Sequence, residues 1–86
     1  MKLKDGFVLR EVAGENVVIP SGGDLALNMM MTLNDTGAFL WRKLEEETSE
    51  RALVQALLSE YDVDEENAAK HVSAFVEKLR ENEVLV

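Results

Sequence analysis

Near the start of the chain, two short apolar runs are separated by a more polar, glycine-containing stretch. Residues 7–12 and 17–19 are rich in β-branched and other β-forming side chains, and the turn-forming stretch 13–16 separates them. This pattern predicts two short strands joined as a hairpin, with the second strand stopped by Pro20.

Residues 27–33 follow the two-residue period of a β-strand and predict a third strand with one apolar face. That face consists of Leu27, Met29, Met31 and Leu33. The opposite face is polar except for Met30. Two interpretations of the methionines stay open, because methionine serves both in cores and on adaptable peptide-binding surfaces. Alternation favours the core for Met29 and Met31, whereas Met30 is the better candidate for a surface contact.

From residue 34 onward the apolar residues recur at helical spacing, and three helices are predicted. Their expected N-caps are Asn34, either Thr48 or Ser49, and Asp64. The buried stripe of the first helix is expected at Phe39, Leu40 and Leu44. Trp41 lies beside this stripe, and we expect it to be a core residue rather than a stacking residue that contacts a ligand. The buried stripe of the third helix is expected at Ala68, Val72, Phe75, Val76 and Leu79.

Residues 84–86 are too apolar for a free tail, so we expect them to dock on the core or to extend the sheet. Three strands followed by three helices define an α+β domain. The expected architecture is winged-helix-like, with a three-stranded antiparallel sheet followed by a three-helix bundle (βββααα).

Composition and charge narrow the functional classes. The 86 residues predict a single domain over residues 1–86, and the absence of cysteine excludes disulfides and thiolate chemistry. The net charge is −8, and residues 34–86 contribute −7 of it through six Lys/Arg and thirteen Asp/Glu. This acidity argues against a nucleic-acid partner, and no apolar run is long enough for a membrane span. We expect a cytoplasmic protein.

Candidate catalytic residues are scarce. His71 is the only histidine, and no serine lies in the context of a catalytic nucleophile. The histidine and carboxylates show no spacing typical of a metal site. We therefore expect a binding module rather than an enzyme, with no cofactor, no metal and no catalytic residue.

Three segments together resemble the PqqD-like family, named for protein D of pyrroloquinoline quinone (PQQ) biosynthesis. The first is Leu33–Trp41 (LNDTGAFLW), the second is Ala52–Tyr61 (ALVQALLSEY), and the third is the helical stretch Val72–Leu79 with its Phe75-Val76-x-x-Leu79 pattern. The chain departs from the family in its Met-rich third strand and in lacking the glycine that relatives often carry before the final apolar pair.

The resemblance implies a non-catalytic peptide chaperone, a recognition element for ribosomally made, post-translationally modified peptides. Such domains hold the leader of a precursor peptide as an added strand between the third strand and the third helix. They present it to a modifying enzyme, often a radical SAM protein. The residues expected to bind the peptide are Leu27, Asn28, Met29, Met30, Met31, Thr32, His71, Ala74, Phe75 and Lys78.

The residues themselves support part of this mechanism. Asn28–Thr32 contains no lysine or proline to block pairing at a sheet edge, and small Ala74 could leave a groove beside Lys78 and His71. The alternative for these helix residues is a solvated face.

Two other functions remain open. The first is a protein-interaction or dimerisation module that uses the open sheet edge, which would include a homodimer. The second is a winged-helix DNA-binding protein, which the charge of the third helix disfavours. Residues 64–83 carry three Lys/Arg against six Asp/Glu.

Overall fold

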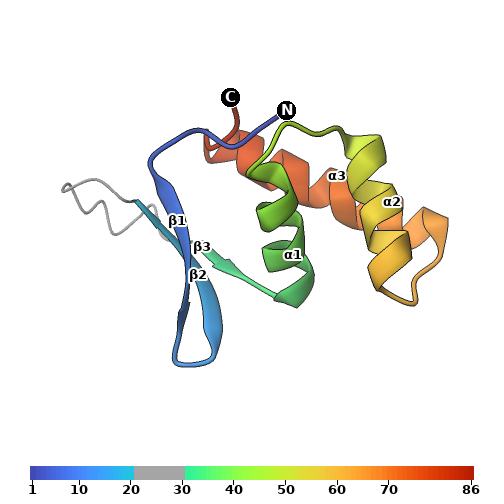
Figure 1. Cartoon of the computed structure of the whole chain (residues 1–86), viewed down its shortest axis with the longest axis horizontal. Coiled ribbons are helices and arrows are strands. Elements are labelled where there is room, and N and C mark those ends of the chain that lie inside the picture. Colours follow the sequence, from blue (N-terminus) through green and yellow to red (C-terminus); the bar gives the residue numbers. More distant parts are fainter. Residues whose placement is uncertain (21–30) are drawn as a thin grey trace.

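The computed structural model describes residues 1–20 and 31–86, and within them three strands precede three helices (Figure 1). The strands are β1 (Phe7–Val12), β2 (Glu15–Pro20) and β3 (Met31–Leu33). They form one antiparallel sheet in the order β1-β2-β3. The predicted α+β class and element order are confirmed. The third strand is confirmed over Met31–Leu33, while the remainder of that prediction, 27–30, lies outside the described residues.

The hairpin is tighter than predicted. Ala13 and Gly14 both adopt positive φ angles, 52° and 82°, and they alone connect Val12 to its pairing partner Glu15. A two-residue turn with positive φ at both positions matches the right-handed twist of the paired strands. The expectation of a four-residue turn and a strand at 17–19 was therefore wrong, and β2 begins two residues earlier.

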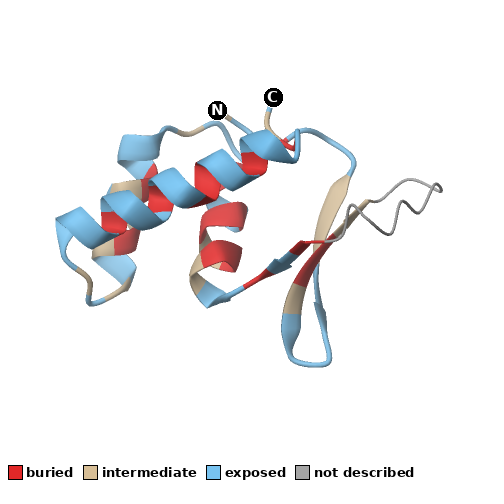
Figure 2. Ribbon diagram, turned by 180° about the vertical axis from the view of Figure 1, so that it is seen from behind, coloured by how far each residue is buried: buried red, intermediate tan, exposed pale blue. Residues whose placement is uncertain are grey.

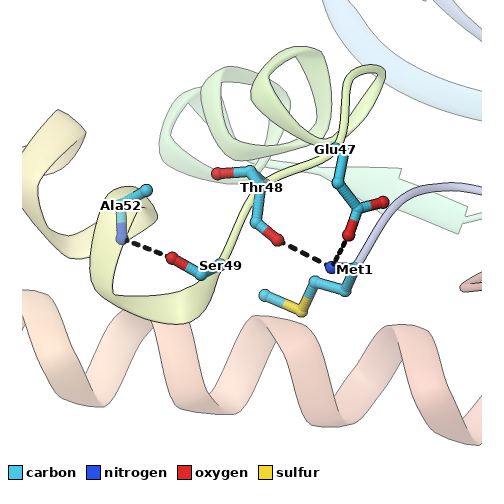
Figure 3. A network of polar contacts seen from close by, with 5 residues as sticks. All are labelled: Met1, Glu47, Thr48, Ser49 and Ala52. Carbon is cyan, nitrogen blue, oxygen red and sulfur yellow. Dashed lines mark hydrogen bonds and ion pairs between the residues drawn. The ribbon is translucent and has the colours of Figure 1, made fainter.

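The helices are α1 (Asp35–Leu44), α2 (Glu50–Glu60) and α3 (Glu65–Glu81). Each has a capping side chain that accepts a hydrogen bond from a first-turn backbone N–H. The N–H of Gly37 donates to Asn34 Oδ1 at 2.7 Å, that of Ala52 to Ser49 Oγ at 3.1 Å (Figure 3), and that of Asn67 to Asp64 Oδ1 at 2.8 Å. These contacts confirm the predicted caps and select Ser49 over Thr48.

The core lies between the inner face of the sheet and the three helices (Figure 2). All five predicted stripe positions of α3 are buried, and Trp41 is 1% exposed, which confirms it as a core residue. Met31 is also buried, as alternation predicted. Phe39 departs from the prediction, because it is only half-buried at the edge of the core.

The segments near residues 3 and 85 lie side by side. Leu3 and Leu85 form an antiparallel bridge, and the Lys4 N–H donates to the Val84 carbonyl at 2.8 Å. Val84 is 1% exposed, so the apolar segment 84–86 docks on the core and pairs with residues 2–4 rather than with the three-stranded sheet. The Met1 amino group also donates to Glu47 Oε1 at 2.6 Å (Figure 3).

The C-terminal end of α3 closes with a Schellman motif at Glu83. The N–H of Val84 donates to the Leu79 carbonyl and that of Glu83 to the Arg80 carbonyl. Glu83 has a φ of 57°, in the left-handed region where glycine is the usual residue. The glycine that relatives often carry before the final apolar pair would fall close to this residue.

We expect Glu83→Gly to raise the free energy of unfolding by about 0.5–1 kcal/mol, because glycine has no Cβ to strain at positive φ. The melting temperature should rise by roughly 4 °C. Urea unfolding monitored by circular dichroism measures this gain. Glu83→Ala is the matched control, since it removes the charge but keeps the Cβ. An equal gain in both variants would contradict the backbone explanation.

Candidate functional site

A hollow of about 370 Å³ lies where β3, the N-terminal half of α1 and the middle of α3 meet. Its walls are formed by Thr32, Leu33, Asn34, Thr36, Gly37, Leu40, His71, Ala74, Phe75 and Lys78. We call this hollow the β3–α3 groove. It combines a short strand on one side with the exposed face of a helix on the other, so it can admit an extended chain.

The floor of the groove depends on a close approach between α1 and α3. A Cβ built on Gly37 would lie 3.3 Å from Leu33 Cβ and 3.3 Å from Phe75 Cε1. The absence of a side chain at residue 37 lets the Phe75 ring, itself only 9% exposed, pack against the start of α1. Phe75 therefore belongs both to the core and to the groove wall.

Among the described residues, Lys78 is the one Lys or Arg in the wall of the groove. Two other cations of α3 are paired along the helix, Lys70 with Glu66 at 3.5 Å and Arg80 with Glu77 at 3.8 Å. Within residues 1–20 and 31–86, Lys78 forms no such ion pair. Its ammonium is thus available to an acidic group that enters the groove.

The sheet leaves the outer edge of β3 open among the described strands. β2 pairs with β1 on one side and with β3 on the other, so β1 and β3 are the two edges. Thr32, opposite Val17 of β2, points away from the core and is exposed. An edge strand beside a groove presents backbone donors and acceptors to any chain lying there.

A second, smaller hollow of about 230 Å³ adjoins the groove. Its walls are Thr36, Leu57, Tyr61, Asp62, Val63 and His71, and we call it the turn pocket because three of these residues connect α2 to α3. Thr36 and His71 line both hollows, so the two lie next to each other. The pocket is smaller than typical small-molecule sites of roughly 300–1,000 Å³.

One wall of the turn pocket is fixed by aromatic packing. The Tyr61 and Phe39 rings meet edge to face, with centroids 5.5 Å apart and planes at 85°. Lys43 Nζ lies 5.4 Å from the Phe39 centroid, within the range of a cation–π contact. Edge-to-face pairs favour one relative orientation of the two rings, so this contact helps to orient the Tyr61 ring that lines the pocket.

The structure brings together five of the residues expected to bind a peptide, namely Thr32, His71, Ala74, Phe75 and Lys78. A sixth, Met31, is buried in the core and does not line the groove. The other four, Leu27, Asn28, Met29 and Met30, lie outside the described residues.

Sequence reasoning missed the contribution of α1 to the groove. Asn34, Thr36 and Gly37 line it, although they were interpreted only as a helix start and as part of a family motif. The composition of that motif could have indicated a role of α1 in the groove. Polar and small residues cluster at the end of a strand, where a helix begins and the backbone is accessible.

Two further kinds of functional feature, a metal site and a membrane-spanning helix, are absent from the described residues. Within it, no group of three or more His, Asp or Glu side chains could hold a metal ion. No helix in residues 1–20 and 31–86 combines the length and apolar character needed to cross a membrane.

Two solved structures are similar to this chain. "TbiB1 in Complex with the TbiA(beta) Leader Peptide" is 26% identical, with a TM-score of 0.77, and the match covers 99% of this chain and 94% of that one. "Lasso peptide synthetase B1 complexed with the leader peptide" is 25% identical, with a TM-score of 0.74, and the match covers 96% and 93%. No curated protein matches. The family profile described as "Coenzyme PQQ synthesis protein D (PqqD)" matches residues 8–85. The chain therefore belongs to the PqqD family.

Proposed function

We propose that this protein is a non-catalytic domain that binds the leader of a ribosomally made precursor peptide in the β3–α3 groove. The observation that carries the proposal is the position of this groove between the open edge of β3 and the exposed face of α3. Both similar solved structures are described as complexes with leader peptides, which supports the same class of ligand here.

The groove supports binding by β-strand addition. A peptide paired with the β3 edge would gain main-chain hydrogen bonds, and these depend little on its sequence. Side chains on one face of that peptide would then point toward Phe75 and Ala74 of α3, and selectivity would arise there. Residues 27–30, predicted from the sequence to extend this strand, belong to the proposal as peptide contacts.

The chemistry on the peptide would belong to a partner enzyme. The family resemblance suggests an enzyme of the radical SAM type or another peptide-modifying enzyme, to which this domain would present the bound leader. A separation of peptide binding from catalysis is consistent with a sequence that shows no recognisable set of catalytic residues. We propose that the protein acts in the cytoplasm.

Amide NMR shifts during titration test the binding site. The probes are synthetic leader segments of short precursors encoded beside the gene, with a scrambled segment as the control. We expect the largest shifts in Met31–Leu33 and in residues 70–79, with a dissociation constant in the micromolar range or below. Shifts confined to α2 or to the β1–β2 hairpin would contradict the site, and no shift with any neighbouring precursor would contradict the function.

A second candidate function is self-association through the edge strand β1, which is open in the sheet of the described residues. Pairing of two β1 strands would join two sheets into one. Light scattering distinguishes the two functions. A dimer that persists at micromolar concentration and does not bind leader segments would favour self-association.

A further inference from the structure

We infer that the peptide site carries opposite charges at its two ends, and that it selects peptides with a basic residue followed about five residues later by an acidic one. This inference rests on the proposed peptide-binding function and adds to it a substrate class and a direction. It follows from three features of the described residues: the free ammonium of Lys78, the free carboxylate of Asp62, and the adjacency of the two hollows.

The anionic end is the turn pocket. Asp62 lines this pocket and is exposed, and it forms no ion pair within residues 1–20 and 31–86. Leu57, Tyr61 and Val63 supply an apolar wall beside it. Arginine and lysine match this combination, because their aliphatic stems cover apolar surface while their charged heads remain near water. The pocket has room for one side chain of this kind.

The cationic end is the Lys78 side of the β3–α3 groove, where an aspartate or glutamate of the peptide would pair with the ammonium. Lys78 and His71 are seven residues apart on α3, which is about 10 Å along the helix axis or three residues of extended chain. The volume of the turn pocket corresponds to a width of roughly 6 Å, and an extended peptide needs about two more residues to cross it. The two peptide charges would therefore be about five residues apart.

The order of the two charged residues along the peptide follows from the topology of the sheet and α3. In Figure 1, β3 advances toward the side of the molecule where the α2–α3 turn lies, and α3 runs back from that side. An added strand that continues the antiparallel alternation of the sheet runs opposite to β3. Such a peptide passes the turn pocket first and Lys78 afterwards, so its basic residue comes before its acidic residue.

Selection from a phage-displayed library of random 12-residue peptides tests the inference on the full chain. Wild-type protein should enrich Lys or Arg about five positions before Asp or Glu. Asp62→Lys should replace only the basic preference with an acidic one, and Lys78→Glu should replace only the acidic preference with a basic one. Peptides selected on wild type should bind each variant roughly fivefold more weakly, the effect of one exposed ion pair.

Two control variants carry the same charge changes outside both hollows. Glu46→Lys and Lys70→Glu alter exposed residues that line neither the groove nor the turn pocket, and they should retain the wild-type preference. Enriched peptides without the ordered charge pair, or with the order reversed, would overturn this inference and leave the proposed function standing. Failure to enrich any peptide on folded protein would overturn both.

Discussion

Replacing Ala74 with tryptophan is expected to weaken leader binding at least tenfold while the domain stays folded. Ala74 is exposed on α3 and lines the β3–α3 groove, so a large side chain there would occupy the space proposed for the peptide. The change adds no volume to the core, and tryptophan costs only a few tenths of a kcal/mol in helix propensity relative to alanine. Fluorescence anisotropy with a labelled leader segment measures the affinity, and circular dichroism measures the fold.

Ala69→Trp is the matched control for this experiment. Ala69 is also exposed on α3 but lies outside the groove and the turn pocket, so the same substitution should leave the affinity within twofold of wild type. Equal losses in both variants would point to a general effect on α3. Unchanged binding in Ala74→Trp would place the peptide elsewhere on the molecule.

Truncation of Trp41 to alanine is expected to lower the free energy of unfolding by about 3–5 kcal/mol. The Trp41 side chain is 1% exposed and packs in the core with Leu40 and Leu44 of the same helix. A domain of 86 residues has a total stability of roughly 4–13 kcal/mol, so the loss would be a large fraction of it. Urea unfolding followed by circular dichroism gives the difference.

Val12→Ala serves as a surface control for stability, and Trp41→Phe separates a core role of Trp41 from a stacking role toward the peptide. Val12→Ala, at a residue that is 54% exposed, should change stability by less than about 0.5 kcal/mol. Trp41→Phe should lose part of the stability but bind leader segments with wild-type affinity. A variant that remained as stable as wild type but lost peptide binding would show that Trp41 contacts the peptide.

The helices could be predicted closely from the sequence because their signals are local. A capping side chain bonds three residues ahead, and the stripe of α3 from Ala68 to Leu79 repeats at the period of the helix itself. The buried faces therefore followed from spacing alone. Phe39 was the exception, because its half-buried position depends on Tyr61, a contact partner 22 residues away.

The groove was harder to predict because it results from packing between distant segments. Its α3 residues could be named, since His71, Ala74 and Lys78 flank the buried stripe and Phe75 belongs to it. The contribution of α1 could not, because the approach of Gly37 to Phe75 joins residues 38 positions apart. The turn pocket was missed for the same reason. The sequence showed Tyr61–Val63 as a turn, and only the fold places that turn beside His71.

The bridge between Leu3 and Leu85 affects when this domain can fold during synthesis. The N–H of Leu3 donates to the Leu44 carbonyl. The N–H of Lys4 donates to the Val84 carbonyl, and that of Val86 donates to the Lys2 carbonyl. Val84 fills a core position, so a nascent chain that ends before this residue lacks both the pairing and the apolar side chain. Contacts so distant in sequence form late. The domain should therefore reach its final packing only after residue 85 has left the ribosome.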